Sequence, residues 1–238
     1  MNLAYDFHIH TALSPCGDTD MTPNNIINMA KLKGLDAIAI TDHNSTANCE
    51  PCIEVARGKD IIVIPGVELQ TKEEIHMLCI FKNIKSALDF QQIINSRLLN
   101  NINNPEIFGK QFVFDKYDQI IMEDKKMLIS AVNITLKEAC VMVMENGGVL
   151  WPAHVDRPSY SIISNLGFIP KELPIKNIEI SQHCNMNNFL SKHPQLKRYR
   201  ILRNSDAHDL QNILERESFI EVKDKNIDSI FAALNNLI

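Results

Sequence analysis

Short apolar runs alternate with helically spaced segments along most of this chain. Strands that are buried on both faces read as continuous apolar runs, so the pattern indicates a parallel sheet covered by helices. The runs that predict strands are 3–9, 36–41, 61–64, 75–81, 149–153, 177–181, 200–204 and 218–222. The segments that predict helices are 23–33, 48–57, 86–100, 135–146 and 226–237.

The segment 101–132 interrupts this rhythm with Asn-rich and charged stretches around short apolar pieces. We interpret it as an irregular insertion with small strands, and as a candidate lid, inside one domain that spans residues 1–238. Strands that alternate with helices over this length predict an α/β fold of the barrel type. In such barrels the functional groups gather at the C-terminal ends of the strands.

Two histidines at alternate positions of the first apolar run, His8 and His10, are the most informative feature. On a strand, side chains two apart share a face, so both rings and the Asp6 carboxylate are expected on one side. Imidazole and carboxylate are the ligands expected for Zn, Mn or Fe, and together with similar groups elsewhere they predict a metal site built from many strands. Those other groups are His43, Glu68, His76, His154, Asp206 and His208.

All but one of these groups follow or end a strand. His76 begins its run, which indicates that this strand is antiparallel or locally irregular.

Composition and charge limit the kinds of molecule that the chain is expected to bind. The formal net charge of −5 offers no basic footprint for a long polyanion, so we do not expect a nucleic-acid polymer as partner. A small phosphorylated substrate stays compatible, because a metal cluster supplies local positive charge. No apolar stretch approaches the roughly 20 residues that span a bilayer, and the first 15 residues lack the pattern of a secretory signal. We therefore expect a cytoplasmic protein with no membrane partner.

The six cysteines do not indicate a disulfide framework in a chain of this size without a signal. Cys49 and Cys52 have the CxxC spacing of a redox pair or of half a zinc site. No second CxxC accompanies them, so we favour reduced thiols without a function of their own.

The candidate ligands, with their neighbours, resemble the motifs of the PHP (polymerase and histidinol phosphatase) family. The resemblance follows the family's order and covers almost the whole chain. It implies a distorted seven-stranded (β/α) barrel, similar to a TIM barrel, which binds two or three divalent metal ions and hydrolyses phosphate esters. The segments that carry it are Asp6-Phe7-His8-Ile9-His10, Thr41-Asp42-His43, Gly66-Val67-Glu68, His76, Pro152-Ala153-His154 and Ser205-Asp206-Ala207-His208.

The resemblance also implies how the ligands divide among the metals. The first metal takes His8, His10, Glu68 and Asp206. Glu68 bridges to a second metal held by His76 and His154, and the third takes Asp18, His43 and His208. Asp20 is the alternative to Asp18, because the interval after the second histidine is long here. If neither aspartate binds, a two-metal site remains.

Water that bridges two divalent ions becomes hydroxide near neutral pH, and paired metals stabilise the attacking and leaving oxygens of an in-line displacement at phosphorus. We therefore assign Asp206 and His208 to catalysis as well as to metal binding. Asp6 and Asp42 lie beside ligands, where they either orient imidazoles or have a plain structural role.

Two further residues are candidates for contact with the substrate. Arg157 is expected to hold a phosphate in fork geometry, with a surface salt bridge as the alternative. His183 is expected to contact the substrate or to protonate the leaving group, with a simple loop histidine as the alternative. Cys184 or Asn185 could take its inward-facing place.

The leading hypothesis is a metal-dependent hydrolase of a small phosphate monoester, such as a nucleotide or a sugar phosphate, that acts through a metal-bridging hydroxide. The first alternative is an exonuclease-like phosphodiesterase on nucleic-acid ends, which requires a basic groove. The second is a non-catalytic, regulatory metal-binding module, which the nearly complete ligand set disfavours.

Overall fold

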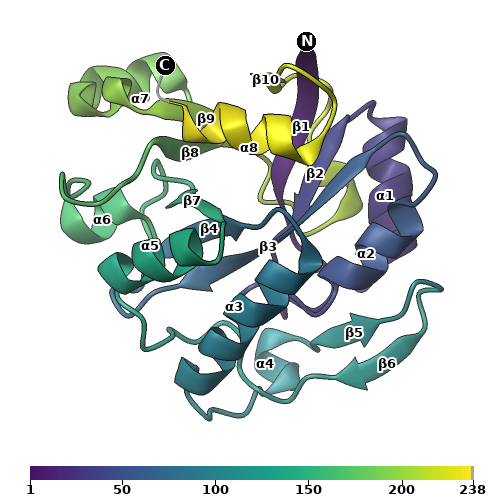
Figure 1. The fold of residues 1–238 in the computed structure, drawn as a ribbon. Helices are drawn as coiled ribbons and strands as arrows, with labels where there is room; N and C mark the ends of the chain where they lie inside the picture. The colour runs from purple at the N-terminus through teal and green to yellow at the C-terminus, as the bar shows by residue number, and fades with distance from the viewer. Residues whose placement is uncertain (237–238) are drawn as a thin grey trace.

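A strongly curled sheet forms the centre of the molecule in the computed structural model, which describes residues 1–236, and helices surround it (Figure 1). The main sheet has the order β10-β1-β2-β3-β4-β7. Its strands are β1 (Asn2–Ile9), β2 (Ala37–Ile40), β3 (Ile62–Gln70), β4 (His76–Ile80), β7 (Val149–Pro152) and β10 (Phe219–Glu221).

Two more strands, β8 (Asn177–Ser181) and β9 (Arg200–Asn204), form a parallel pair. This pair lies between the ends of the curled sheet, because β8 contacts β7 and β9 contacts β1. A bridge from Ile9 to Ala207 adds to the second contact. The predicted α/β fold, a distorted barrel similar to a TIM barrel, is confirmed.

The pairing departs from an all-parallel barrel at β4, which runs antiparallel to both β3 and β7. His76 therefore starts β4 at the edge of the sheet where β3 ends with Gln70. The antiparallel strand explains how a residue at the beginning of a strand shares an edge with residues at the ends of others.

Helices cover the outside of the sheet, close to the predicted segments. Thr135 begins α5 with a capping box that includes Glu138. The helices are α1 (Pro23–Leu32), α2 (Cys49–Ala56), α3 (Ile84–Arg97), α4 (Pro105–Phe108), α5 (Leu136–Glu145), α6 (Ile162–Leu166), α7 (Met186–Lys192) and α8 (Ile227–Asn235), with short 3-10 turns at Pro194–Arg198 and Leu210–Asn212. The predicted end of the last helix, residues 237 and 238, lies outside the described residues.

The segment 101–132 contains α4 and a hairpin of β5 (Phe112–Phe114) and β6 (Ile120–Glu123). It is fixed to the rest of the molecule. The Phe112 amide donates to the Ala12 carbonyl at 2.9 Å, and the Asn48 side chain bonds both Phe112 and Phe114. The hairpin is thus anchored beside the loop that follows β1.

An apolar cluster fills the interior of the curled sheet. Phe7 and Trp151, both fully buried, are among its largest members, and α8 closes it. Asp36 links the C-terminal segment to β1. Its carboxylate accepts a hydrogen bond from the Ala4 amide and forms ion pairs with Arg216 at 2.9 Å and Lys225 at 3.0 Å.

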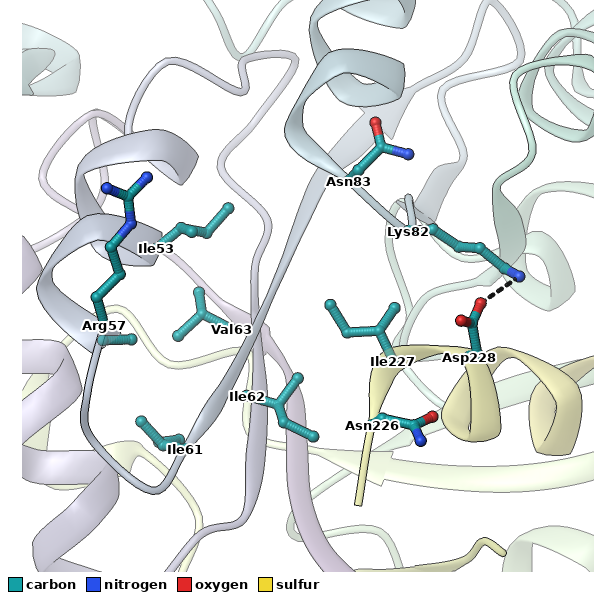
Figure 2. Close-up of a pocket in the computed structure, with 11 residues that line it drawn as sticks. Ile53, Arg57, Ile61, Ile62, Val63, Lys82, Asn83, Asn226, Ile227 and Asp228 are labelled. Atoms are coloured by element: carbon teal, nitrogen blue, oxygen red, sulfur yellow. Dashed lines mark hydrogen bonds and ion pairs between the residues drawn. The ribbon is translucent and has the colours of Figure 1, made fainter. Parts of the chain in front are cut away.

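A pocket of isoleucines lies at the start of β3, at the opposite end of that strand from Glu68 (Figure 2). The ion pair of Lys82 and Asp228, 2.7 Å long, borders it. No helix within residues 1–236 has the length and apolar character needed to cross a membrane.

Candidate metal centre

His8 and His10 lie at the C-terminal end of β1, fully buried, with their Nε2 atoms 3.1 Å apart. The pairing of β1 with β2 shifts register between Asp6 and Ile9. Such irregularities redirect side chains and are frequent beside active sites. Asp6 consequently bonds the backbone amides of Ser205 and Leu214, which supports its structural role.

Glu68, near the end of β3, is the centre of the cluster. Its carboxylate is fully buried and lies within ion-pair distance of five imidazoles. The distances are 3.3 Å to His8, 3.4 Å to His10, 2.9 Å to His43, 2.8 Å to His76 and 3.3 Å to His154. A carboxylate with imidazoles around both of its oxygens could hold a divalent cation together with them.

Asp206 approaches from the loop after β9. Its Oδ1 atom lies 3.1 Å from Nε2 of His8 and 3.0 Å from Nε2 of His10. Its Oδ2 atom lies 2.5 Å from the guanidinium of Arg157, and Nδ1 of His208 is 3.6 Å from Oδ1.

The ligand atoms assemble into three groups, each with all its atoms within 4.8 Å of one another. His154 joins them through its contact with Glu68. Eight of the nine predicted ligands therefore converge, from both halves of the chain. The three groups are His8, His10, Glu68 and Asp206; His43, Glu68 and His76; and His10, His43 and His208.

Several buried atoms of the cluster have no hydrogen-bond partner among the described residues. These include Oε2 of Glu68, Oδ1 of Asp206, and Nδ1 of His43 and His76, each of which lies 2.8–3.0 Å from an ionisable neighbour but is not aligned for a hydrogen bond with it. Buried polar atoms normally have partners, and orphaned ones in a cluster of imidazoles and carboxylates are the donor set for a divalent cation. The residues therefore fit a metal centre.

Burial and neighbouring charges both shift the pKa values of the groups in the cluster. Burial alone would raise the pKa of Glu68, but the rings of His76, His8 and His43 hold it well below its ordinary value. For His10, burial and the neighbouring imidazoles of His208 and His43 together lower the pKa well below its usual range. Burial would lower the pKa of His8 and of His43, but the carboxylates that face them, Glu179 and Glu68 first among them, raise both well above the usual range. Binding of a cation to these imidazoles therefore displaces protons.

Two carboxylates orient the imidazoles from behind. Glu179 on β8 accepts from Nδ1 of His8 at 2.9 Å and from the amide of His154 at 3.1 Å. Asp42 accepts from the Ser14 hydroxyl at 2.7 Å, and that hydroxyl bonds Nδ1 of His10 at 2.8 Å. Asp42 thus acts on His10 through Ser14. In both histidines the Nε2 atom is left to face the cluster.

Sequence reasoning missed Glu179. The signal was a carboxylate inside the apolar run Asn177-Ile178-Glu179-Ile180, where a charged side chain gains nothing from burial without partners.

The backbone is strained at two residues of the cluster. His154 has φ of 28° and Asp206 has φ of 53°, both in the left-handed region that side chains other than glycine rarely adopt. Such strain is found at functional sites, where the surrounding structure enforces it.

Asp18 lies outside the three groups, contrary to the prediction. It is exposed, its carboxylate accepts from the Asp20 amide at 2.9 Å, and its own amide bonds the His208 carbonyl. Asp20 is exposed as well. His10 takes the predicted place of Asp18 beside His43 and His208. The physical reason is the tight turn of the loop, which keeps the Asp18 carboxylate in a local hydrogen bond.

Cys16, which the sequence did not single out, lies exposed on the same loop, and it belongs to none of the three groups. Burial would raise the pKa of its thiol, but the imidazoles of His208 and His43 lower that pKa to about 6.

Of the two substrate candidates, Arg157 lies at the cluster through its contact with Asp206. His183 is exposed on the loop after β8, and no hydrogen bond or ion pair of the described residues joins it to the cluster. Cys49 and Cys52 are buried free thiols in α2, and burial raises the pKa of Cys49 to about 12. Such a thiol is a poor nucleophile.

A family model described as the PHP domain matches residues 6–141, more than half of the chain. The chain belongs to the PHP family. The match ends before His154, Asp206 and His208, which the structure brings to the same cluster. The prediction of a metal-dependent phosphoesterase is confirmed at the level of this family.

Curated relatives share segments of the chain. An uncharacterized protein of Methanocaldococcus jannaschii is 26% identical over 163 residues, which are 68% of this chain and 18% of that protein. The 5'-3' exoribonuclease Rnm of Escherichia coli is 39% identical over 74 residues, 30% of this chain and 24% of the exoribonuclease. The chain spans less than two thirds of the length of these relatives.

Solved structures share the fold. The lesion-specific endonuclease EndoQ from Pyrococcus furiosus superposes with a TM-score of 0.74 and 22% identity, over 99% of this chain and 56% of the endonuclease. Endonuclease Q in complex with a 27-mer duplex that has an abasic lesion gives 0.73 and 22%, over 98% and 56%. A protein from Bifidobacterium adolescentis, assigned as a metal-dependent phosphoesterase, gives 0.57 and 18%, over 86% and 87%.

The net charge led us to expect no nucleic-acid polymer as partner, and this expectation is wrong. Endonuclease Q has this fold and was solved with a 27-mer duplex substrate that has an abasic lesion at the active site. Net charge averages over the whole surface, whereas recognition depends on the local field at the site.

Proposed function

We propose that this PHP domain hydrolyses phosphodiester bonds in nucleic acid at the metal centre around Glu68. The main support is the buried Glu68 carboxylate, which lies among five imidazoles, with Asp206 beside two of them. Divalent ions bound there would polarise the phosphoryl oxygens and lower the pKa of the attacking water. The nucleic-acid substrate is supported by the likeness to an exoribonuclease and to the fold of Endonuclease Q.

Two side chains beside the centre suit a nucleotide. The guanidinium of Arg157, partly exposed, is within reach of a phosphate that approaches Asp206. The ring of Tyr160 is 46% exposed and stacks on His76, with ring centroids 4.9 Å apart. Exposed aromatic rings are platforms for bases, and one such contact contributes about 1–3 kcal/mol.

A small phosphate monoester is the second candidate substrate. Three carboxylates line a hollow beside the loop of His208, namely Asp18, Asp20 and Asp209. Their charge would repel a long polyanion and tolerate a small ester or a strand end.

A substrate panel tests the proposal. The protein, loaded with Mn²⁺, Zn²⁺ or Fe²⁺, is incubated with end-labelled single-stranded RNA and DNA, with a duplex that has an abasic site, and with nucleotides and sugar phosphates. We expect cleavage of an oligonucleotide that chelation abolishes. Inert oligonucleotides together with phosphate release from small esters would assign the second candidate instead.

Tyr160→Ala refines this test, with Tyr117→Ala as the matched control, since Tyr117 is an exposed ring on the hairpin. We expect the first variant alone to raise KM for oligonucleotides by about tenfold or more, with little change for p-nitrophenyl phosphate. Equal KM values in both variants would remove Tyr160 from the binding role.

A further inference from the structure

One stretch of the chain, residues 180–205, contains five lysines and arginines and not one aspartate or glutamate. The whole chain has a net charge of −5, so this stretch has the opposite sign to the chain as a whole. It runs from the end of β8 through α7 and the turn Pro194–Arg198 into β9. Three of its cations, Lys192, Lys197 and Arg198, are exposed, and none forms an ion pair with a carboxylate of residues 1–236.

The other two cations of the stretch bond backbone carbonyls. Arg203 donates to the carbonyls of Ser181 and Cys184, both at 3.1 Å, and Arg200 donates to that of Ala233. The bonds of Arg203 fix the loop between β8 and α7. Because a carbonyl oxygen has no formal charge, both guanidinium groups still add to the positive field of this surface.

A mostly apolar hollow of about 360 Å³ opens beside the exposed cations. The rings of Phe168, which is 57% exposed, and Tyr199 line it. The Arg198 guanidinium lies over the Tyr199 ring, 4.7 Å from its centroid. Lys171 and Glu172 add one charge of each sign. Proteins bind single-stranded nucleic acid with such groups, because cations follow the phosphates and aromatic rings stack on the bases.

The beginning of the stretch lies at the metal centre. Ser181, the last residue of β8, bonds the Asp156 carboxylate through its amide at 2.8 Å and through its hydroxyl at 2.6 Å. The residue after Asp156 is Arg157, which contacts Asp206 of the metal centre. A strand that leaves the metal centre past Arg157 therefore meets the loop that leads into α7.

The hollow lies at the far end of β9 from the metal centre. Tyr199 precedes Asn204, the last residue of β9, by five positions, which is about 16 Å along a strand. At about 3.4 Å per nucleotide of a stacked strand, this distance corresponds to about five nucleotides. α7 lies at the edge of the molecule beside β8 and β9, so nothing among the described elements covers this path (Figure 1).

We propose that residues 180–205 and the hollow at Phe168 form a second contact surface for single-stranded nucleic acid, about five nucleotides from the bond that is cleaved. The inference rests on the proposed function, since it assumes that the metal centre acts on a polymer. The phosphates pass the exposed cations and a base stacks in the hollow. The acidic hollow beside His208 repels phosphates, whereas this surface attracts them.

Binding of a strand that resists cleavage tests the proposal. The Mn²⁺-loaded protein is titrated into fluorescein-labelled oligothymidylate and oligouridylate with phosphorothioate linkages, and anisotropy is followed over a range of salt concentrations. Strands of about twelve nucleotides reach the hollow, and dinucleotides do not. We expect Lys192→Gln/Lys197→Gln to weaken binding of the longer strands. The slope of log Kd against log salt should fall by about 1.4, since each neutralised phosphate contributes about 0.7. Dinucleotide binding should not change.

Phe168→Ala addresses the hollow separately. It should weaken binding of the longer strands by about tenfold with an unchanged salt slope, because stacking on a ring releases no counterions. Lys31→Gln/Lys137→Gln is the matched control, since both lysines are exposed on other helices, α1 and α5. It should change neither the affinity nor the slope.

Equal affinities and salt slopes in the unaltered protein and in Lys192→Gln/Lys197→Gln would overturn the proposal. Unchanged binding in Phe168→Ala, or an equal loss in the lysine control, would do the same. If oligonucleotides are cleaved and both test variants keep the KM of the unaltered protein, the proposed function stands and this surface fails. If the strands bind as expected but no nucleic acid is cleaved, the surface stands and the proposed function fails.

Discussion

Replacement of Glu179 by glutamine tests how the cluster is held in place, because the change removes a charge and almost no volume. The buried carboxylate faces four donors. Its Oε1 atom accepts from Nδ1 of His8 and the amide of His154, and its Oε2 atom accepts from the Asn204 side chain at 2.6 Å and the Trp151 indole at 3.5 Å.

No orientation of a glutamine amide suits these partners. If the NH₂ group faces Asn204, it meets another NH₂ group that cannot rotate away, since Oδ1 of Asn204 accepts from the Phe7 amide at 2.9 Å. If the NH₂ group faces His8, the backbone amide of His154 is left opposed to it. The His8 ring could accept only with its proton on Nε2, the atom that faces the cluster.

Either orientation leaves at least one fixed, buried donor without an acceptor, at a cost of about 1–3 kcal/mol. Loss of the carboxylate that fixes the ring and the tautomer of a metal-binding histidine weakens metal binding by about 10–100-fold. We therefore expect Glu179→Gln to lower both the free energy of unfolding of the metal-free protein and the affinity for Zn²⁺.

Urea unfolding of the metal-free protein and calorimetric titration with Zn²⁺ measure the two effects. Glu172→Gln is the matched control, because Glu172 is exposed and its replacement should change neither quantity. A Glu179→Gln protein with unchanged stability and unchanged Zn²⁺ affinity would refute the orienting role.

Three further changes address the cluster and the fold. His10→Ala or Asp206→Ala should lose bound metal and activity together, as elemental analysis and a phosphoesterase assay would show; activity without the metal would contradict the proposed centre. Arg157→Ala should chiefly raise KM, by about tenfold, since a charge-assisted hydrogen bond contributes about 1.5–3 kcal/mol; an unchanged KM excludes phosphate binding by this residue. Burial opposes ionisation of Asp36, but its hydrogen bonds and neighbouring cations, Lys225 among them, outweigh this and lower its pKa. Its stabilising effect should be complete above about pH 4, the pKa of the unfolded state, and be lost as the pH falls through the lower folded value. Asp36→Asn should therefore lower the urea midpoint at pH 7 and not at the lowest pH that the folded protein tolerates; an equal loss at both would contradict the ionic role.

Local patterns in the sequence predicted most of this architecture. The apolar runs gave the strands, and the position of His76 at the beginning of its run pointed to the antiparallel β4. Ligands that follow strands could be predicted because the edge of a sheet gathers them, however far apart they lie in the chain.

The parts that could not be predicted depend on loops and on long-range contacts. The turns that follow β1 keep the Asp18 carboxylate in a local hydrogen bond, outside the groups of candidate ligands, and the spacing of residues alone does not determine a turn. Glu179 required knowledge that β8 lies behind His8. Net charge misled because it contains no spatial information.

The cluster joins segments from near both ends of the chain, since His8 and His10 precede the first helix while Asp206 and His208 follow β9. A cation held between them acts as a reversible cross-link that closes nearly the entire polypeptide into one loop. Chelation should accordingly lower the free energy of unfolding of the whole molecule. A fragment of residues 6–141 would keep His8 and His10 but not Asp206 and His208, so it could not form this cross-link.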